Sequence, residues 1–217
     1  MKKKILTLAL AVVTIFCLSA CGKEEVIDNT PVLSVPKNFE ASEEIINTNI
    51  NDGKFQYCDA TIEIGSKVGT LLEFSGAKIT KGYGSKILET TFLEPGESGS
   101  IDITTNDDNV LTVYIYNAAN IKQYPSGCTI TGIYYYNTNN EQINNEQYGM
   151  AHLPGGITLS EKEGNFTKYL SQYTSENNKK VLSDTNIIAY YKTESYTLTI
   201  VYDKDSKIIN QIKYSVN

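Results

Sequence analysis

Hydrophobic and polar residues alternate along much of the chain after about residue 54, a period of two that is typical of strands with one packed face. The clearest example is the segment 196–202, where Tyr, Leu, Ile and Tyr alternate with Thr, Thr and Val. The same criterion predicts strands at 55–64, 88–92, 100–104, 110–117, 129–136, 157–159, 187–192, 196–202 and 208–214.

Two short helices interrupt this pattern. The first is expected to begin after Ser66, as N-cap, and to end at Gly76, a typical helix stop. The second places Phe166, Leu170 and Tyr173 at i, i+4 and i+7, on one helical face. These elements predict an α+β fold, β-rich overall, made of two small units in which a short helix packs on an antiparallel sheet.

The order of the elements also repeats faintly between the two halves. Each half has a strand-like segment, a helix and then several strands. The matching segments are 62–66 with 157–160, 111–113 with 198–200, and 131–134 with 210–214. We take these matches as a hypothesis of two related units.

The N-terminus has the pattern of an export signal. Three lysines at positions 2–4 precede an apolar run at 5–18, which is shorter than the roughly 20 residues of a membrane-spanning helix. The run ends in Leu18-Ser19-Ala20-Cys21-Gly22, which resembles the lipobox of bacterial lipoproteins. The resemblance implies that residues 1–20 are removed and that Cys21 is diacylated, which anchors the chain to the extracytoplasmic face of the cell membrane. The alternative is an ordinary cleaved signal with a nearby cysteine.

The mature chain then divides by composition. Residues 21–53 are polar and contain Pro31 and Pro36, so they are expected to form a flexible tether, with one or two helical turns near 40–46. Residues 54–140 are predicted to form an N-terminal β-rich α+β domain. Residues 141–217 are predicted to form a C-terminal domain with a helix and an antiparallel sheet.

Charge and composition exclude several classes of function. All 19 basic residues are lysines, and the net charge is -6. Without residues 1–20 the chain has 16 lysines against 25 acidic residues, a net charge of -9. Nucleic-acid binding is therefore not expected. The single histidine, His152, cannot form a multi-histidine metal site, and no nucleophile–base pair can be assembled, so neither an enzyme nor a cofactor is expected.

Two cysteines remain after the signal and the acylated residue are set aside. Cys58 and Cys128 each precede an apolar strand pattern, and an exported chain favours disulfides. We expect a Cys58–Cys128 disulfide if those strands begin side by side. Two buried free thiols are the alternative.

Tyrosine is abundant, with 16 residues in a chain that has no tryptophan. Alternation places Tyr114 and Tyr116 opposite the aliphatic residues of their strand, and Tyr134 and Tyr136 share a face in the strand 129–136. Tyrosine provides a large rigid contact area with a polar tip, so these four residues are the candidate binding face. The alternative is that cross-strand tyrosine pairs only cover a sheet.

The folded part also resembles a known class of lipoproteins. The resemblance rests on segments 153–157, 196–200 and 203–209 in the second half and on 64–72 and 128–133 in the first half. These segments are similar to the tandem units found in lipoproteins of low-G+C bacteria, whose fold is that of the β-lactamase inhibitor protein and of the small lipoprotein of the outer-membrane assembly machine. The resemblance implies contact with another protein through the sheet face.

We therefore expect a membrane-anchored, non-enzymatic protein-interaction module whose partner is an envelope or secreted protein. The alternative is a lipoprotein that binds a small ligand or a glycan and serves uptake, with the aromatic face stacking on the ligand.

Overall fold

A computed structural model describes residues 40–80, 87–105, 110–136, 150–173 and 178–217. The chain from Pro36 to Asn217 forms one compact unit. The predicted signal peptide and Cys21 lie outside the described residues. In the described ranges, no helix is long and apolar enough to cross a membrane.

The fold is α+β and β-rich, with two antiparallel sheets. The small sheet has the order β2 (Ala60–Glu63), β1 (Lys54–Tyr57) and β7 (Ala151–His152). The large sheet has eight strands, in the order β3 (Lys78–Thr80), β4 (Ser98–Thr104), β5 (Val110–Tyr116), β6 (Thr129–Tyr136), β11 (Ile209–Val216), β10 (Tyr196–Asp203), β9 (Asn186–Lys192) and β8 (Lys179–Val181).

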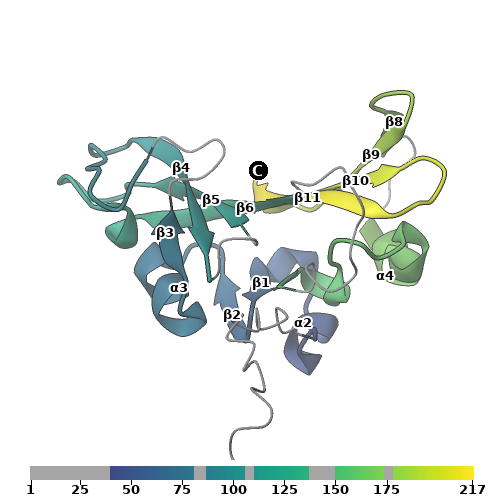
Figure 1. Ribbon diagram of the computed structural model, residues 1–217, viewed down its shortest axis with the longest axis horizontal. Helices are drawn as coiled ribbons and strands as arrows, with labels where there is room; N and C mark the ends of the chain where they lie inside the picture. Colours follow the sequence, from purple (N-terminus) through teal and green to yellow (C-terminus); the bar gives the residue numbers. More distant parts are fainter. Residues whose placement is uncertain (1–39, 81–86, 106–109, 137–149, 174–177) are drawn as a thin grey trace, which may run out of the picture. The chain divides into compact units, whose positions relative to one another are not determined.

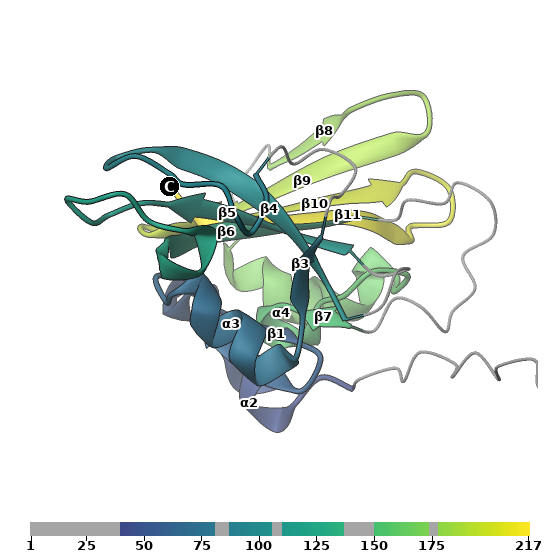
Figure 2. The same ribbon diagram turned by 60° about the vertical axis from the view of Figure 1, so that its left-hand side comes forward.

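The helices and the small sheet lie on one face of the large sheet (Figures 1 and 2). Helix α3 ends at Gly76, whose φ of 67° is left-handed, so the predicted stop is confirmed. Its N-cap is Lys67, without a capping side chain, and not the expected Ser66. The α-helices are α2 (Glu43–Asn47), α3 (Val68–Ser75) and α4 (Thr167–Leu170), and the 3₁₀ turns are η1 (Ile50–Asp52), η2 (Pro125–Gly127), η3 (Pro154–Gly156), η4 (Glu163–Phe166) and η5 (Ser171–Tyr173).

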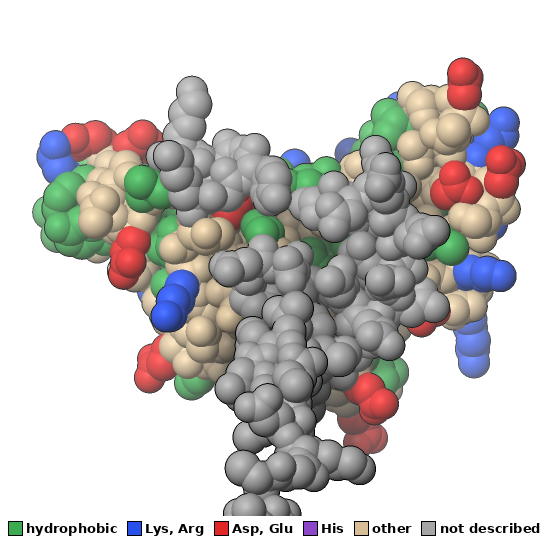
Figure 3. All heavy atoms as spheres, viewed as in Figure 1, with side chains coloured by type: hydrophobic (Ala, Val, Ile, Leu, Met, Phe, Trp, Pro, Cys, Tyr) green, Lys and Arg blue, Asp and Glu red, His purple; other side chains and the backbone are tan. Residues whose placement is uncertain are grey.

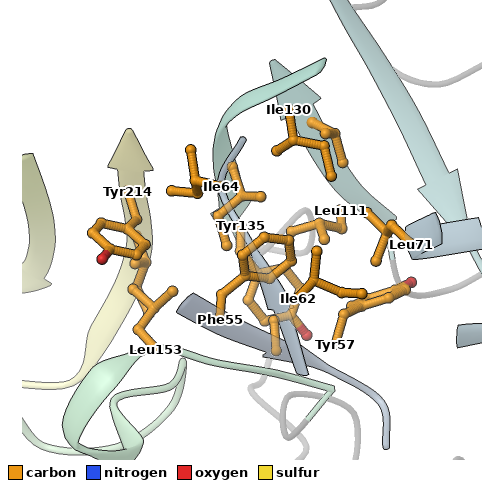
Figure 4. Packing of buried hydrophobic residues seen from close by; sticks show 14 of the residues in the cluster. Phe55, Tyr57, Ile62, Ile64, Leu71, Leu111, Ile130, Tyr135, Leu153 and Tyr214 are labelled. Carbon is orange, nitrogen blue, oxygen red and sulfur yellow. The ribbon is translucent and has the colours of Figure 1, made fainter. Parts of the chain in front are cut away.

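The core lies between the large sheet and this covering layer. Alternate residues of β5 and β6 turn towards the layer, and Tyr135 packs beside Phe55 and Ile62 of the small sheet (Figure 4). Tyr214 of β11 is fully buried, and its hydroxyl donates a hydrogen bond to the carbonyl of Ile50 at 2.5 Å. We call the side of the large sheet that faces the covering layer the inner face and the opposite side the outer face.

The strands of both halves join in the one large sheet, because β6 pairs with β11. The pairing pattern around β6 recurs around β11. Strand β5 pairs with β6 as β10 pairs with β11, and the register shift falls at matching points, Tyr114/Ile115 and Val201/Tyr202. Three contacts also recur. The β-bridge of Lys67 with Thr129 corresponds to that of Lys162 with Ile208. The backbone N–H groups of Val68 and Gly65 donate to the carbonyls of Cys128 and Ile130, as those of Glu163 and Ser160 donate to Lys207 and Ile209.

The folded part begins earlier than expected. Residues 40–53 were predicted to belong to the tether, yet Ile45 and Ile50 within them are fully buried. Buried Gln56 of β1 holds the beginning of this segment, since its amide donates to the carbonyl of Glu40 and its oxygen accepts from the N–H of Ser42. The prediction failed because two buried isoleucines in a polar segment give no periodic signal.

Several strand predictions also need correction. The predicted strand 55–64 is a hairpin of β1 and β2, in which Cys58 occupies the turn with a φ of 53°. Residues 88–92 form no strand, and in 157–159 only Ile157 forms an isolated bridge, with Leu153. Three short strands, β3, β7 and β8, were missed because two or three residues are too few to show alternation.

Candidate functional site

The inner and outer faces of β5 and β6 separate aliphatic side chains from tyrosines. Leu111, Val113 and Ile115 are fully buried on the inner face. Tyr114 and Tyr134 are partly exposed on the outer face, which agrees with the predicted alternation. A β-bulge at Gly132 shifts the pairing of β5 and β6 by one residue, between Tyr114 and Ile115. Residues on the same face of the two strands therefore still lie opposite each other on both sides of the bulge.

Three of the four predicted tyrosines lie close together on the outer face. The rings of Tyr134 and Tyr136 stack with centroids 4.8 Å apart. The Tyr134 hydroxyl donates to Oε1 of Gln211 at 3.1 Å, and the Lys213 ammonium lies 4.9 Å from the ring centroid of Tyr114. These contacts fix the rings before any partner binds, which reduces the entropy cost of binding.

Partial burial makes two of these phenols weaker acids. Burial raises the pKa of Tyr114. Burial also raises the pKa of Tyr134, and the neighbouring Tyr136 and Tyr114 raise it further. Each hydroxyl is therefore a neutral donor and acceptor at neutral pH. We call Tyr114, Tyr134 and Tyr136 the tyrosine cluster.

Tyr116, the fourth predicted residue, lies apart from the cluster. It is the last residue of β5, is 37% exposed, and its hydroxyl reaches the turn at Gly96. Sequence reasoning missed Tyr190 of β9, which shares the outer face and has the Lys180 ammonium 5.9 Å from its ring centroid. The alternation of Ile188, Tyr190 and Lys192 with buried neighbours was the available signal.

Three rows of paired residues connect the tyrosine cluster with the second half of the sheet. Each row contains one tyrosine from β5 or β6 and one lysine from β8, β9 or β11. The rows are Tyr114–Gly132–Ser215–Thr197–Lys192, Tyr134–Lys213–Thr199–Tyr190, and Tyr136–Gln211–Val201–Ile188–Lys180. In these three rows the tyrosine cluster lies in the first half and the lysines lie in the second half.

The predicted disulfide is wrong in this structure, where Cys58 and Cys128 are buried free thiols. Cys58 precedes β2, whereas Cys128 accepts a backbone hydrogen bond from Val68, beyond the far end of β2. The two cysteines therefore lie at opposite ends of that strand, and the condition that their strands begin side by side is not met.

We expect both thiols to be unreactive until the chain unfolds. Burial raises the pKa of Cys58 to about 11, although hydrogen bonding to Thr105 opposes the increase. Burial also raises the pKa of Cys128. Both therefore remain thiols below these raised values, and only the thiolate reacts. A chain from Gly22 onward, treated with Ellman's reagent at pH 8, should show two thiols in denaturant without reductant and almost none when folded. Cys58→Ser should leave one thiol, and no thiol in the denatured chain would contradict the structure.

Potential metal-binding side chains do not cluster in the described part of the chain. No group of three potential metal-binding side chains occurs in these ranges. His152 is 5% exposed in β7 and pairs with Gln56, so it belongs to the small sheet and not to the outer face.

A separate exposed apolar group lies at the end of the large sheet, over the loops 88–97 and 117–127, where hydrophobic side chains gather in Figure 3. Its members include Phe92 and Tyr124, whose ring centroids are 4.0 Å apart, and Ile121, which is 61% exposed. No charge or contact in the described residues indicates what binds it.

Comparison of the chain with protein-family models, with curated proteins and with solved structures gives no match.

Proposed function

We propose that this protein is a non-enzymatic interaction module that binds an envelope or secreted protein through the tyrosine cluster. We further propose that Cys21 carries a diacyl anchor, which holds the module at the extracytoplasmic face of the cell membrane. In this proposal the two halves are related α+β units, each a helix on four strands, joined at β6 and β11.

The observation that carries the proposal is the ordered, partly exposed set of tyrosines on a sheet face. Stacking between Tyr134 and Tyr136 and the contact of Lys213 with Tyr114 hold the rings in place. Tyrosines that only covered a sheet would be expected at matching positions of both repeats, but position 114 corresponds to Val201 and position 134 to Lys213 in the second half. The inner face retains similar residues, for example Leu111 and Leu198, or Tyr135 and Tyr214.

Loss of the ring surface should remove binding. We expect Tyr114→Ala/Tyr136→Ala to lower capture of crosslinked protein partners from intact cells by at least tenfold, because buried tyrosine anchors dominate interface energies. Tyr124→Ala removes a more exposed tyrosine ring outside the outer face and is the control. The measurement is the yield of reproducible partner bands after crosslinking and pull-down.

The same cells separate anchoring from binding. Cys21→Ala should shift the chain out of the membrane fraction and keep tyrosine-dependent capture. Equal capture by the Tyr114→Ala/Tyr136→Ala variant and by the original chain would reject the proposed function. Stabilisation by glycans in a thermal-shift screen, lost in the same double variant, would favour the uptake alternative.

A further inference from the structure

The outer face carries lysines that form no ion pair with a carboxylate of the described residues. Lys78, Lys180, Lys192 and Lys213 are exposed on this face, which follows from the strand pairings. Among the described residues, none of these four forms an ion pair, whereas Lys54, Lys122 and Lys179 pair with Glu44, Glu94 and Glu163 respectively. Two of the four ammonium groups instead lie over tyrosine rings.

The pairings of the described strands place two carboxylates on the same face, one buried and one at its rim. Asp102 is 2% exposed, and its Oδ1 accepts a hydrogen bond from Thr112. Asp203 lies at the rim at the end of β10, where its side chain accepts the backbone N–H groups of Asp205 and Ser206. The exposed charge within the face is therefore positive.

The opposite side of the molecule has the reverse charge. The part of the covering layer built from α2, η1, β1, β2 and α3 contains two lysines, Lys54 and Lys67, and six acidic residues. These acidic residues are Glu43, Glu44, Asp52, Asp59, Glu63 and Glu73. In a chain of net charge -6, four of the nine described lysines without an ion pair thus lie on the outer face, and the other five lie elsewhere.

We infer that the outer face recognises an acidic patch on its protein partner, next to an apolar contact with the tyrosine cluster. This inference rests on the proposed function and specifies its partner. Opposite potentials steer the encounter and fix the orientation, and the acidic covering layer repels the same partner from the wrong side.

A folded protein fits this face better than an anionic polymer. Seven spacings of about 4.8 Å separate β3 from β8, and strands of seven residues are about 24 Å long, so the face covers about 800 Å², the size of one side of a standard protein interface. The lysines are spread over β3, β8, β9 and β11 and are separated by Thr, Val and Ile side chains. A polyphosphate chain would instead require closely spaced cations along one line.

The test uses the full-length chain in intact cells, with p-benzoylphenylalanine as the photo-crosslinker in place of Tyr116, an exposed outer-face residue outside the tyrosine cluster. The charge variant is Lys180→Glu/Lys192→Glu, because neither lysine has a contact with the tyrosine cluster in the described residues. The control is Lys54→Glu/Lys122→Glu, which changes the net charge equally at lysines outside the outer face. We expect the charge variant to lower the yield of protein crosslinks about tenfold and the control to leave it within twofold.

Each outcome decides the inference. Protein crosslinks with equal yield in both variants would overturn the acidic patch and leave the proposed function intact. The absence of any protein crosslink from position 116 would overturn the proposed function together with the inference. Lysine-dependent crosslinks to a cell-wall polymer, and not to protein, would overturn the choice of partner. Thermal midpoints of both variants within about 3 °C of the original chain confirm that folding is unchanged.

Discussion

Replacing Gly132 by alanine should lower the free energy of unfolding by about 2–3 kcal/mol, because the new methyl group has no room at the junction of the two halves. A Cβ at this position would lie 2.5 Å from Cβ of Ser215 and 2.8 Å from the backbone oxygen of Tyr214. The backbone of β11 cannot rotate away as a side chain can. Strands β6 and β11 would have to separate locally, at the pairing that joins the halves in one sheet.

Gly164→Ala is the matched control for this prediction. A Cβ at Gly164 would meet no atom within 4 Å, and the residue has no left-handed φ. We expect its stability to stay within about 0.5 kcal/mol of the original chain or to increase slightly. Urea unfolding of both variants gives the comparison. A Gly132→Ala chain as stable as the original would mean that β6 and β11 do not pair in this register.

Features of the fold that depend on local sequence were predictable, and features that depend on distant contacts were not. Alternation along β6 predicted its bounds, Thr129–Tyr136, because one face of that strand is buried along its length. The hairpin of β1 and β2 was missed, because its turn contains Cys58 and Asp59 and no glycine or proline. Tertiary packing supports the left-handed Cys58, and such support is not visible in a single sequence.

In the candidate site, only the residues that follow from alternation within a strand were predicted. Tyr114, Tyr134 and Tyr136 follow from alternation within two strands. Lys213 lies beside Tyr134 only because β11 pairs with β6, a contact between residues 79 positions apart. The predicted disulfide failed for the same reason, since the spacing of Cys58 and Cys128 does not show which strand ends meet.

The two halves should unfold together, although the sequence divides them at about residue 140. Leu111 of β5 and Leu198 of β10 occupy matching positions in the repeated pairing, and both are fully buried. Leu111→Ala and Leu198→Ala should each cost about 2–5 kcal/mol, because the truncation leaves a cavity in the core. For a unit of this size, a loss of 3 kcal/mol lowers the thermal midpoint by about 6–12 °C.

The number of thermal unfolding transitions shows whether the two halves unfold together. One sheet runs through both halves, and the segment 40–53 contacts the second half through Thr48, whose carbonyl accepts from the Tyr169 hydroxyl, and through Ile50. We therefore expect a single calorimetric transition that either substitution shifts as a whole. Two transitions, of which Leu111→Ala moved only one and Leu198→Ala only the other, would show that the halves are independent domains. A single transition would mean that the tyrosines of the first half and the lysines of the second are held in one rigid surface, as binding of a single partner across the outer face requires.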